Sequence, residues 1–455
     1  MDSLPQPAPP PYAADDTSDN ILRGDRGDPQ PDSISPASAS DGASSGSLAQ
    51  ELLTQPGATL AQAGLALQPA APESQAPTHG LDWVIRAALW VALVALFAQQ
   101  LGEPLNGPAL FPLLLFAVFA GAFLLASVPL VARALRHAAQ VEPVGLSLAP
   151  LIVLAPFILY AQMNGALDPT DLLTSGSMLY LPSAIAIINT PQFRRGDLLL
   201  GLITVATPLV LPLTRNETID SSDAVLRIGA FLIPLALLAL TSREQKRNLN
   251  FLFVCAVLSV WYAVEFEAFP DFPLFLMEGA GYFQMALLPL FLFLLAVSGQ
   301  FQGIGLSFRP TARGVSIAAS NLILLAVVSV PVGLFSGFLV PAFAAPAPLE
   351  VAISLLTGFV FVALPEEILF RGTIFRYLEQ TLRLPQAGAI VVSSIVFGLA
   401  HLNNPPDIGW YFVLATIAGI FYARTYIATR NVATSAVVHT IVNWVWAVAF
   451  SGGLR

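Results

Sequence analysis

The chain has 455 residues, of which 55% are hydrophobic and only 11% are charged, and its mean hydropathy is +0.71. This composition excludes an ordinary soluble domain and predicts a multi-pass membrane protein. The formal net charge of -9 arises almost entirely in residues 1–80, which hold ten acidic residues against two arginines.

Residues 1–80 are rich in Pro, Ala, Ser, Gln and Asp and show no sustained apolar period. Such a segment buries too little surface to offset its ordering entropy, so we predict a disordered acidic tail. Residues 1–12 are acidic and proline-rich rather than basic and apolar, so we expect no cleaved signal peptide. The single cysteine, Cys255, excludes a disulfide within the chain.

From residue 81 onward, apolar runs of roughly 15 to 30 residues alternate with short polar connections. A helix needs about 20 residues to cross the ~30 Å of hydrocarbon in a bilayer. We therefore predict an all-α transmembrane bundle of eleven to thirteen helices. The candidate spans centre near residues 92, 120, 155, 184, 205, 233, 257, 289, 328, 358, 393, 416 and 441.

Basic residues fall in alternate connections between these spans, whereas the intervening connections are mostly acidic. Cytoplasmic loops are enriched in Lys and Arg, so this alternation predicts a cytoplasmic N-terminal tail. Very low lysine content beside abundant Ala, Leu and Arg favours a bacterial plasma membrane. The basic connections contain Arg133 and Arg136, Arg194 and Arg195, Arg243 to Arg247, Arg309 and Arg313, Arg376 and Arg383, and Arg424 and Arg430.

Three polar stretches interrupt the apolar sequence near the C-terminus, at residues 364–372, 393–404 and 435–446. Ionisable groups at membrane depth cost about 2.5 to 3.5 kcal/mol each on insertion scales, so they tend to mark function. We therefore divide the chain into the tail, a transmembrane block of unassigned role at 81–310, and a domain at 311–455 that carries the chemistry.

The first stretch contains two adjacent glutamates, Glu366 and Glu367, which point about 100° apart on a helix and so cannot serve the same role. Glu367 and Arg371 are spaced i, i+4, which suits an ion pair on one helix face. Glu366 is then the better candidate for a general base or a metal ligand. The alternative reading is that all three residues form the polar end of an ordinary membrane crossing.

The other two stretches each place a histidine four residues from a partner. His401 follows Phe397, and His439 precedes Asn443, so each pair shares a helix face. Imidazole serves as a metal ligand or a proton carrier, and an amide such as Asn443 can donate a hydrogen bond to a developing oxyanion. The combination favours hydrolysis.

The order Glu-Glu-x-x-x-Arg, Phe-x-x-x-His and His-x-x-x-Asn, each on an apolar segment, resembles the CPBP intramembrane protease family. That family includes the type II CAAX prenyl endopeptidases and the bacteriocin-processing Abi-like proteins. The resemblance covers roughly residues 318–450. It implies a helical membrane peptidase that cuts a membrane-associated protein or peptide, with the lipid bilayer as its environment and no nucleic-acid partner.

The resemblance also implies two alternative mechanisms, which the sequence leaves open. Without a metal, Glu366 and His401 would deprotonate the attacking water, and His439 and Asn443 would stabilise the oxyanion. With Zn²⁺, the ligands would be Glu366, His401 and His439. Glu367 and Arg371 would orient the site in either mechanism, with Glu367 as the base an open alternative in the version with Zn²⁺. A non-catalytic membrane scaffold or a transporter remains the alternative function.

One geometric conflict arises within this interpretation. If a crossing begins at Gln386, His401 lies about 22 Å along its helix, whereas Glu366 would lie near the end of its own helix. The two groups meet only if residues 359–382 form one long or broken helix that carries Glu366 at mid-membrane depth.

Overall fold

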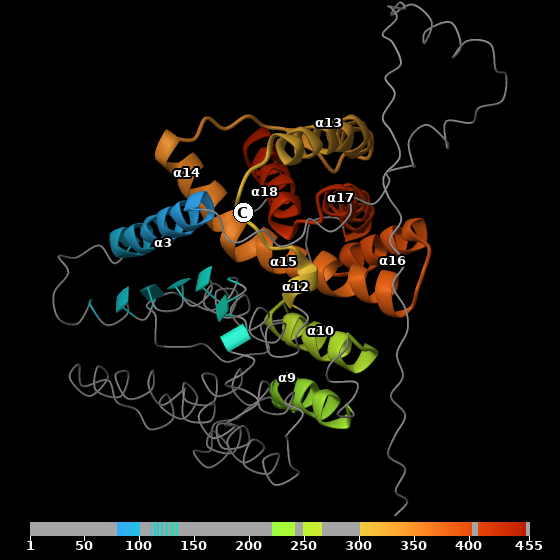
Figure 1. Cartoon of the computed structure of the whole chain (residues 1–455). Coiled ribbons are helices and arrows are strands. Elements are labelled where there is room, and N and C mark those ends of the chain that lie inside the picture. The colour runs from blue at the N-terminus through green and yellow to red at the C-terminus, as the bar shows by residue number, and fades with distance from the viewer. Residues whose placement is uncertain are drawn as a thin grey trace, which may run out of the picture. The chain divides into compact units, whose positions relative to one another are not determined.

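The structure is a computed structural model that describes residues 80–100, 221–241, 249–265, 301–402 and 408–451, with scattered positions between 110 and 134. These residues are almost wholly helical (Figure 1), as the composition predicted. The predicted disordered tail, apart from residue 80, and the predicted spans centred near residues 155, 184, 205 and 289 lie outside the described residues.

The longer described helices are α3 (Gly80–Gln100), α9 (Ser221–Leu240), α10 (Phe251–Glu265), α13 (Ala312–Phe335), α14 (Pro348–Thr357), α16 (Gln386–Leu399), α17 (Ile408–Thr429) and α18 (Val432–Ala449). A short helix, α12 (Phe301–Ile304), precedes α13. Strands β1 (Val340–Pro341) and β2 (Phe450–Ser451) form one antiparallel pair, with Val340 opposite Ser451.

Five stretches among the described residues are long and apolar enough to cross a membrane. They are Gly80–Gln99, Ala312–Phe335, Pro348–Thr381, Gly409–Thr429 and Val432–Ala449. Two shorter apolar helices cover Phe251–Tyr262 and Gln386–Leu399. The polytopic helical class is therefore as predicted, whereas the described residues do not establish the predicted count of eleven to thirteen helices.

The helix that carries the two glutamates runs from Pro348 to Thr381 and alternates between α and π geometry. After α14 follow η2 (Gly358–Ala363), α15 (Leu364–Leu369), η3 (Phe370–Phe375) and η4 (Tyr377–Thr381). Pro365 has no N–H to donate to the preceding turn, and the backbone there is widened, with the Leu364 N–H donating to the Phe359 carbonyl. Glu366 thus lies near the middle of one long, locally widened helix, as the conflict above required.

Helix α17 packs against α13, α16 and α18 (Figure 1). Its contact with α16 is closest at Gly398, where an added Cβ would lie 2.1 Å from Oγ1 of Thr416 and 2.8 Å from the Phe412 carbonyl oxygen. Any larger residue at this position would push the two helices apart. Gly398 therefore sets the spacing between α16, which precedes His401, and α17.

The turn between α17 and α18 is held to two other parts of the bundle. The Arg430 guanidinium donates two hydrogen bonds to Glu379, at 3.0 and 3.1 Å. Burial acts to lower the pKa of Arg430, but the hydrogen bonds and charge of Glu379 raise it above its ordinary value. Asn431 caps α18 by accepting from the Ala433 N–H and also exchanges hydrogen bonds with the backbone of Ser307. This turn, the end of the long helix and the segment before α13 therefore lie at one end of the bundle.

Helix α3 is joined to the C-terminal helices through a buried ion pair. Asp82 accepts from Arg86 Nε at 2.6 Å and from the backbone N–H of Phe308 at 3.1 Å. Arg86 also donates to the Leu124 carbonyl at 2.7 Å and lies 4.8 Å from the centroid of the Phe308 ring. The Phe308 ring in turn packs edge-on against Phe359 of the long helix. The first predicted span therefore contacts the segment that leads into α13.

We expect Arg86→Met to lower the free energy of unfolding by about 3 to 5 kcal/mol, because it leaves the buried Asp82 carboxylate without its charge partner. Thermal unfolding of the detergent-solubilised protein measures this loss. Arg313→Met is the matched control, since Arg313 is exposed at the start of α13. Equal unfolding temperatures for the two variants would contradict the assigned role of the pair.

Candidate active site

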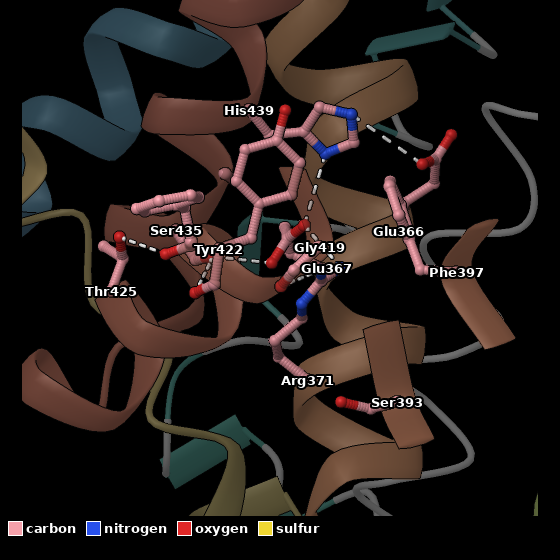
Figure 2. Close-up of polar contacts among 12 residues, drawn as sticks. Glu366, Glu367, Arg371, Ser393, Phe397, Gly419, Tyr422, Thr425, Ser435 and His439 are labelled. Atoms are coloured by element: carbon pink, nitrogen blue, oxygen red, sulfur yellow. Dashed lines mark hydrogen bonds and ion pairs between the residues drawn. The ribbon is translucent and has the colours of Figure 1, made fainter. Parts of the chain in front are cut away.

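The two adjacent glutamates of α15 have different surroundings, as their spacing predicted. The Glu367 side chain is fully buried, with 0% of its surface exposed, whereas the Glu366 side chain is 15% exposed. Figure 2 shows the two side chains pointing in different directions from the same helical turn. The Glu367 carboxylate is therefore fully enclosed, whereas the Glu366 side chain is partly exposed although its Oε2 atom is buried.

Glu367 forms the predicted ion pair with Arg371, with 2.9 Å between Oε1 and Nη1. Arg371 is also fully buried, and its Nη2 donates to the Gly419 carbonyl of α17 at 3.0 Å. Its guanidinium lies 4.6 Å from the centroid of the Phe397 ring and 5.3 Å from that of Tyr422. Opposite charge, a hydrogen bond and two aromatic rings together stabilise a cation at a depth where an unpaired charge would be costly.

His439 of α18 lies between the two glutamates. Its Nδ1 lies 3.2 Å from Glu367 Oε1, and its Nε2 lies 3.8 Å from Glu366 Oε2. An ionised carboxylate can only accept, so Nδ1 carries the hydrogen and Nε2 holds the lone pair in the neutral ring. The basic nitrogen of His439 therefore faces the more exposed carboxylate.

Two residues that the sequence analysis did not single out complete this arrangement. Ser435 Oγ lies 2.6 Å from Glu367 Oε2, and Tyr422 stacks on the His439 ring with centroids 4.6 Å apart and planes 20° apart. Figure 2 shows both beside Glu367 and His439. Ser435 precedes His439 by one helical turn, so its position on the same face was a usable signal. Nothing in the local sequence of α17 distinguished Tyr422.

His401 lies just after the end of α16 and contacts the same cluster through Phe397. Its Nδ1 donates to the Phe397 carbonyl at 2.8 Å, because a carbonyl oxygen can only accept. Its ring stacks on Tyr411 with centroids 5.2 Å apart. The Phe397 ring contacts both His401 and His439, at centroid distances of 4.7 and 5.6 Å. The two predicted histidines thus both contact one phenylalanine.

Asn443 follows His439 by one turn of α18 and is half-buried. The structure therefore places Glu366, Glu367, Arg371 and His439 in one connected cluster. His401 joins that cluster through ring packing, and Asn443 lies beside it along the helix.

A zinc site is not formed by the described side chains. Among the residues with described positions, no three His, Cys, Asp or Glu side chains converge closely enough to hold a metal ion. Glu366 faces His439, whereas His401 is engaged with Phe397 and Tyr411. In both histidines Nδ1 lies against an acceptor oxygen, which leaves Nε2 as the lone-pair nitrogen that a metal ligand needs. The tautomers suit a metal, but the three-ligand set that the resemblance implied does not fit this geometry.

The cluster contains the groups needed for acid–base chemistry on a bound water. A carboxylate with partial access to the surface lies beside an imidazole whose orientation is held by a second, buried carboxylate. A base whose ring is oriented by a further acidic group is a recurring arrangement in hydrolytic enzymes. The geometry can therefore position and deprotonate a nucleophile.

Comparison with known proteins bears on this cluster. Residues 348–445, about a fifth of the chain, match the model of the family described as type II CAAX prenyl endopeptidase Rce1-like. No curated protein and no solved structure gave a match. The matched residues contain all three sequence signatures and every side chain of the cluster described above. Residues 348–445 of this integral membrane protein therefore form a domain of the Rce1-like family of type II CAAX prenyl endopeptidases.

Proposed function

We propose that this chain is an intramembrane endopeptidase that hydrolyses a peptide bond in a membrane-associated protein or peptide. The observation that carries the proposal is the position of His439 between a buried and a partly exposed glutamate, inside the segment that matches a peptidase family. A purely structural polar network would need only the buried Glu367–Arg371 pair.

In the proposed reaction, Glu366 and His439 hold the attacking water. Their Oε2 and Nε2 atoms are 3.8 Å apart, so a water at about 2.8 Å from each could hydrogen-bond to both. Glu366 accepts a proton from this water as the water oxygen bonds to the scissile carbonyl carbon. The proton then passes to the amide nitrogen as the carbon–nitrogen bond breaks, which leaves a carboxylate and an amine as products.

The remaining residues orient His439 or stabilise the oxyanion in this mechanism. Glu367 accepts from the Nδ1–H of His439, and the ion pair with Arg371 holds Glu367 in place. The Asn443 amide donates to the oxyanion, with His401 as a second group beside the reacting centre. This assignment pairs Glu366 with His439 rather than with His401, because His439 Nε2 lies 3.8 Å from Glu366 Oε2 while Nδ1 of the same ring lies against Glu367.

The proposed substrates are membrane-associated proteins, with lipidated termini and leader-bearing precursors as the two classes to test. We further propose a bacterial plasma-membrane location with a cytoplasmic N-terminus. The arginine-containing turns at residues 309–313 and 430, together with the end of the long helix at 381–383, lie at one end of the bundle, which supports the cytoplasmic assignment of that end.

We expect Glu366→Gln to lower the cleavage rate by about 10²- to 10⁴-fold, because the amide cannot accept the proton of the attacking water. The unfolding temperature should change little, since the Glu366 side chain is partly exposed. Profiling of peptide termini in membranes that carry the native protein or the variant at matched levels measures this effect and identifies substrates. Identical profiles, in cells that nevertheless require Glu366, would point to a binding or transport role.

Glu367→Gln should affect both activity and stability, unlike the same change at the neighbouring position. It leaves Arg371 as a buried cation without its counter-charge, so we expect the free energy of unfolding to fall by about 3 to 5 kcal/mol. The unfolding temperature, measured together with the cleavage rate, distinguishes the roles of the two glutamates. A Glu367→Gln variant as stable as Glu366→Gln would show that the two roles are wrongly assigned.

The proposed water activation uses protein groups alone, so we expect cleavage to persist after exhaustive chelation and dialysis. Activity and metal content are measured on the same purified sample, with a zinc-loaded sample as the comparison. Loss of activity that one equivalent of Zn²⁺ restores would instead favour the metal-dependent alternative with Glu366, His401 and His439 as ligands.

A further inference from the structure

Ser435 occupies a buried position between a carboxylate and a backbone carbonyl. Its Oγ lies 2.6 Å from Glu367 Oε2 and 2.9 Å from the Tyr422 carbonyl oxygen, and the residue is 0% exposed. A serine hydroxyl has one hydrogen to donate. The short distance and the charge of the acceptor favour donation to Glu367.

This hydrogen bond determines how the Glu367 carboxylate can rotate. Oε1 accepts from both Arg371 Nη1 and His439 Nδ1, and Oε2 accepts from Ser435. Without the Ser435 bond, the carboxylate could turn to place both oxygens toward the two-pronged guanidinium of Arg371, an arrangement that Arg and carboxylate groups favour. Oε1 would then move relative to His439.

The His439 ring is the group most sensitive to such a rotation. At 3.2 Å, its bond to Oε1 is the longest of the three hydrogen bonds that Glu367 accepts from side chains in the described structure. The stacked Tyr422 ring fixes the plane of the imidazole but does not distinguish the ring from one turned by about 180° about its Cβ–Cγ bond. The position of Oε1 therefore directs Nε2 toward Glu366.

Ser435 and His439 also share one face of α18, one turn apart. The same helix thus carries the imidazole and the hydroxyl that holds the imidazole's carboxylate partner. A shift of α18 relative to the long helix would move both groups together and preserve their mutual geometry.

We propose that Ser435 is a positioning residue, which holds Glu367 in the rotation that aims His439 Nε2 at the water site beside Glu366. This inference rests on the proposed peptidase function and adds a residue outside the three sequence signatures. Ser435 does not touch the reacting atoms, and its effect on catalysis passes through Glu367 and His439.

The first test compares three variants by steady-state kinetics on a cleaved peptide. Ser435→Ala should lower kcat by about 10- to 100-fold with little change in KM, because reacting groups are misaligned by a fraction of an ångström to about 1 Å. Ser435→Thr keeps the hydroxyl and should retain more activity than Ser435→Ala. Ser393→Ala is the matched control, since the Ser393 hydroxyl is also buried but, among the described residues, donates only to the Ile390 carbonyl of its own helix.

Equal losses in Ser435→Ala and Ser393→Ala, or a threonine variant no better than the alanine variant, would overturn the proposal. The first result would mean that deleting any buried hydroxyl loosens the bundle. The second would mean that volume rather than hydrogen bonding matters at position 435.

The second test does not depend on peptidase activity. The chain has four histidines, so ¹⁵N-histidine labelling gives few ring signals, and His439→Gln identifies those of His439. We expect Ser435→Ala to shift the ring signals of His439, and Ser393→Ala to leave them in place. Unchanged His439 signals in Ser435→Ala would overturn the placement of Ser435. Absence of cleavage by the native protein would instead overturn the peptidase function, while the ring signals still decide the role of Ser435.

Discussion

The buried ion pair between Glu367 and Arg371 is the interaction on which the rest of the site depends. Two charges inside an apolar bundle are tolerated only when each is paired and hydrogen-bonded. Here the partners come from different helices: the Gly419 carbonyl from α17, Ser435 and His439 from α18, and the Phe397 ring from α16. Satisfying one ion pair therefore also fixes how the three helices pack around the long one.

This constraint gives two adjacent residues of the same type different properties. Glu367 is fully buried and has a neighbouring cation, an imidazole and a hydroxyl as donors, so it holds neighbouring groups in place. Glu366 lies one residue earlier, turns about 100° away and retains partial exposure. The division of carboxylates into an orienting group and a reactive group is a common pattern in hydrolytic sites, because environment rather than residue type sets the role.

The length of the helix that carries the glutamates determines how far the two carboxylates lie from its ends. Helix α16 begins at Gln386, and His401 lies just beyond its other end. A glutamate that shares a site with His401 must therefore lie away from the ends of its own helix. The long helix continues to Thr381 through two π segments beyond α15, which places the glutamates near its middle. Widened turns are frequent at functional sites. Here they bring a polar cluster to the depth of the histidines without breaking the helix.

The sequence by itself determined the helical membrane class, the Glu367–Arg371 pair and the two histidines, because hydropathy and i, i+4 spacing depend only on residues near one another in the chain. The resemblance paired Glu366 with His401 in the mechanism without a metal. Only the tertiary structure showed that His439 lies 3.8 Å from Glu366 and that Ser435 and Tyr422 contact Glu367 and His439. Those contacts depend on how α18 and α17 rotate and slide against the long helix, and that packing is set by contacts between residues distant in sequence.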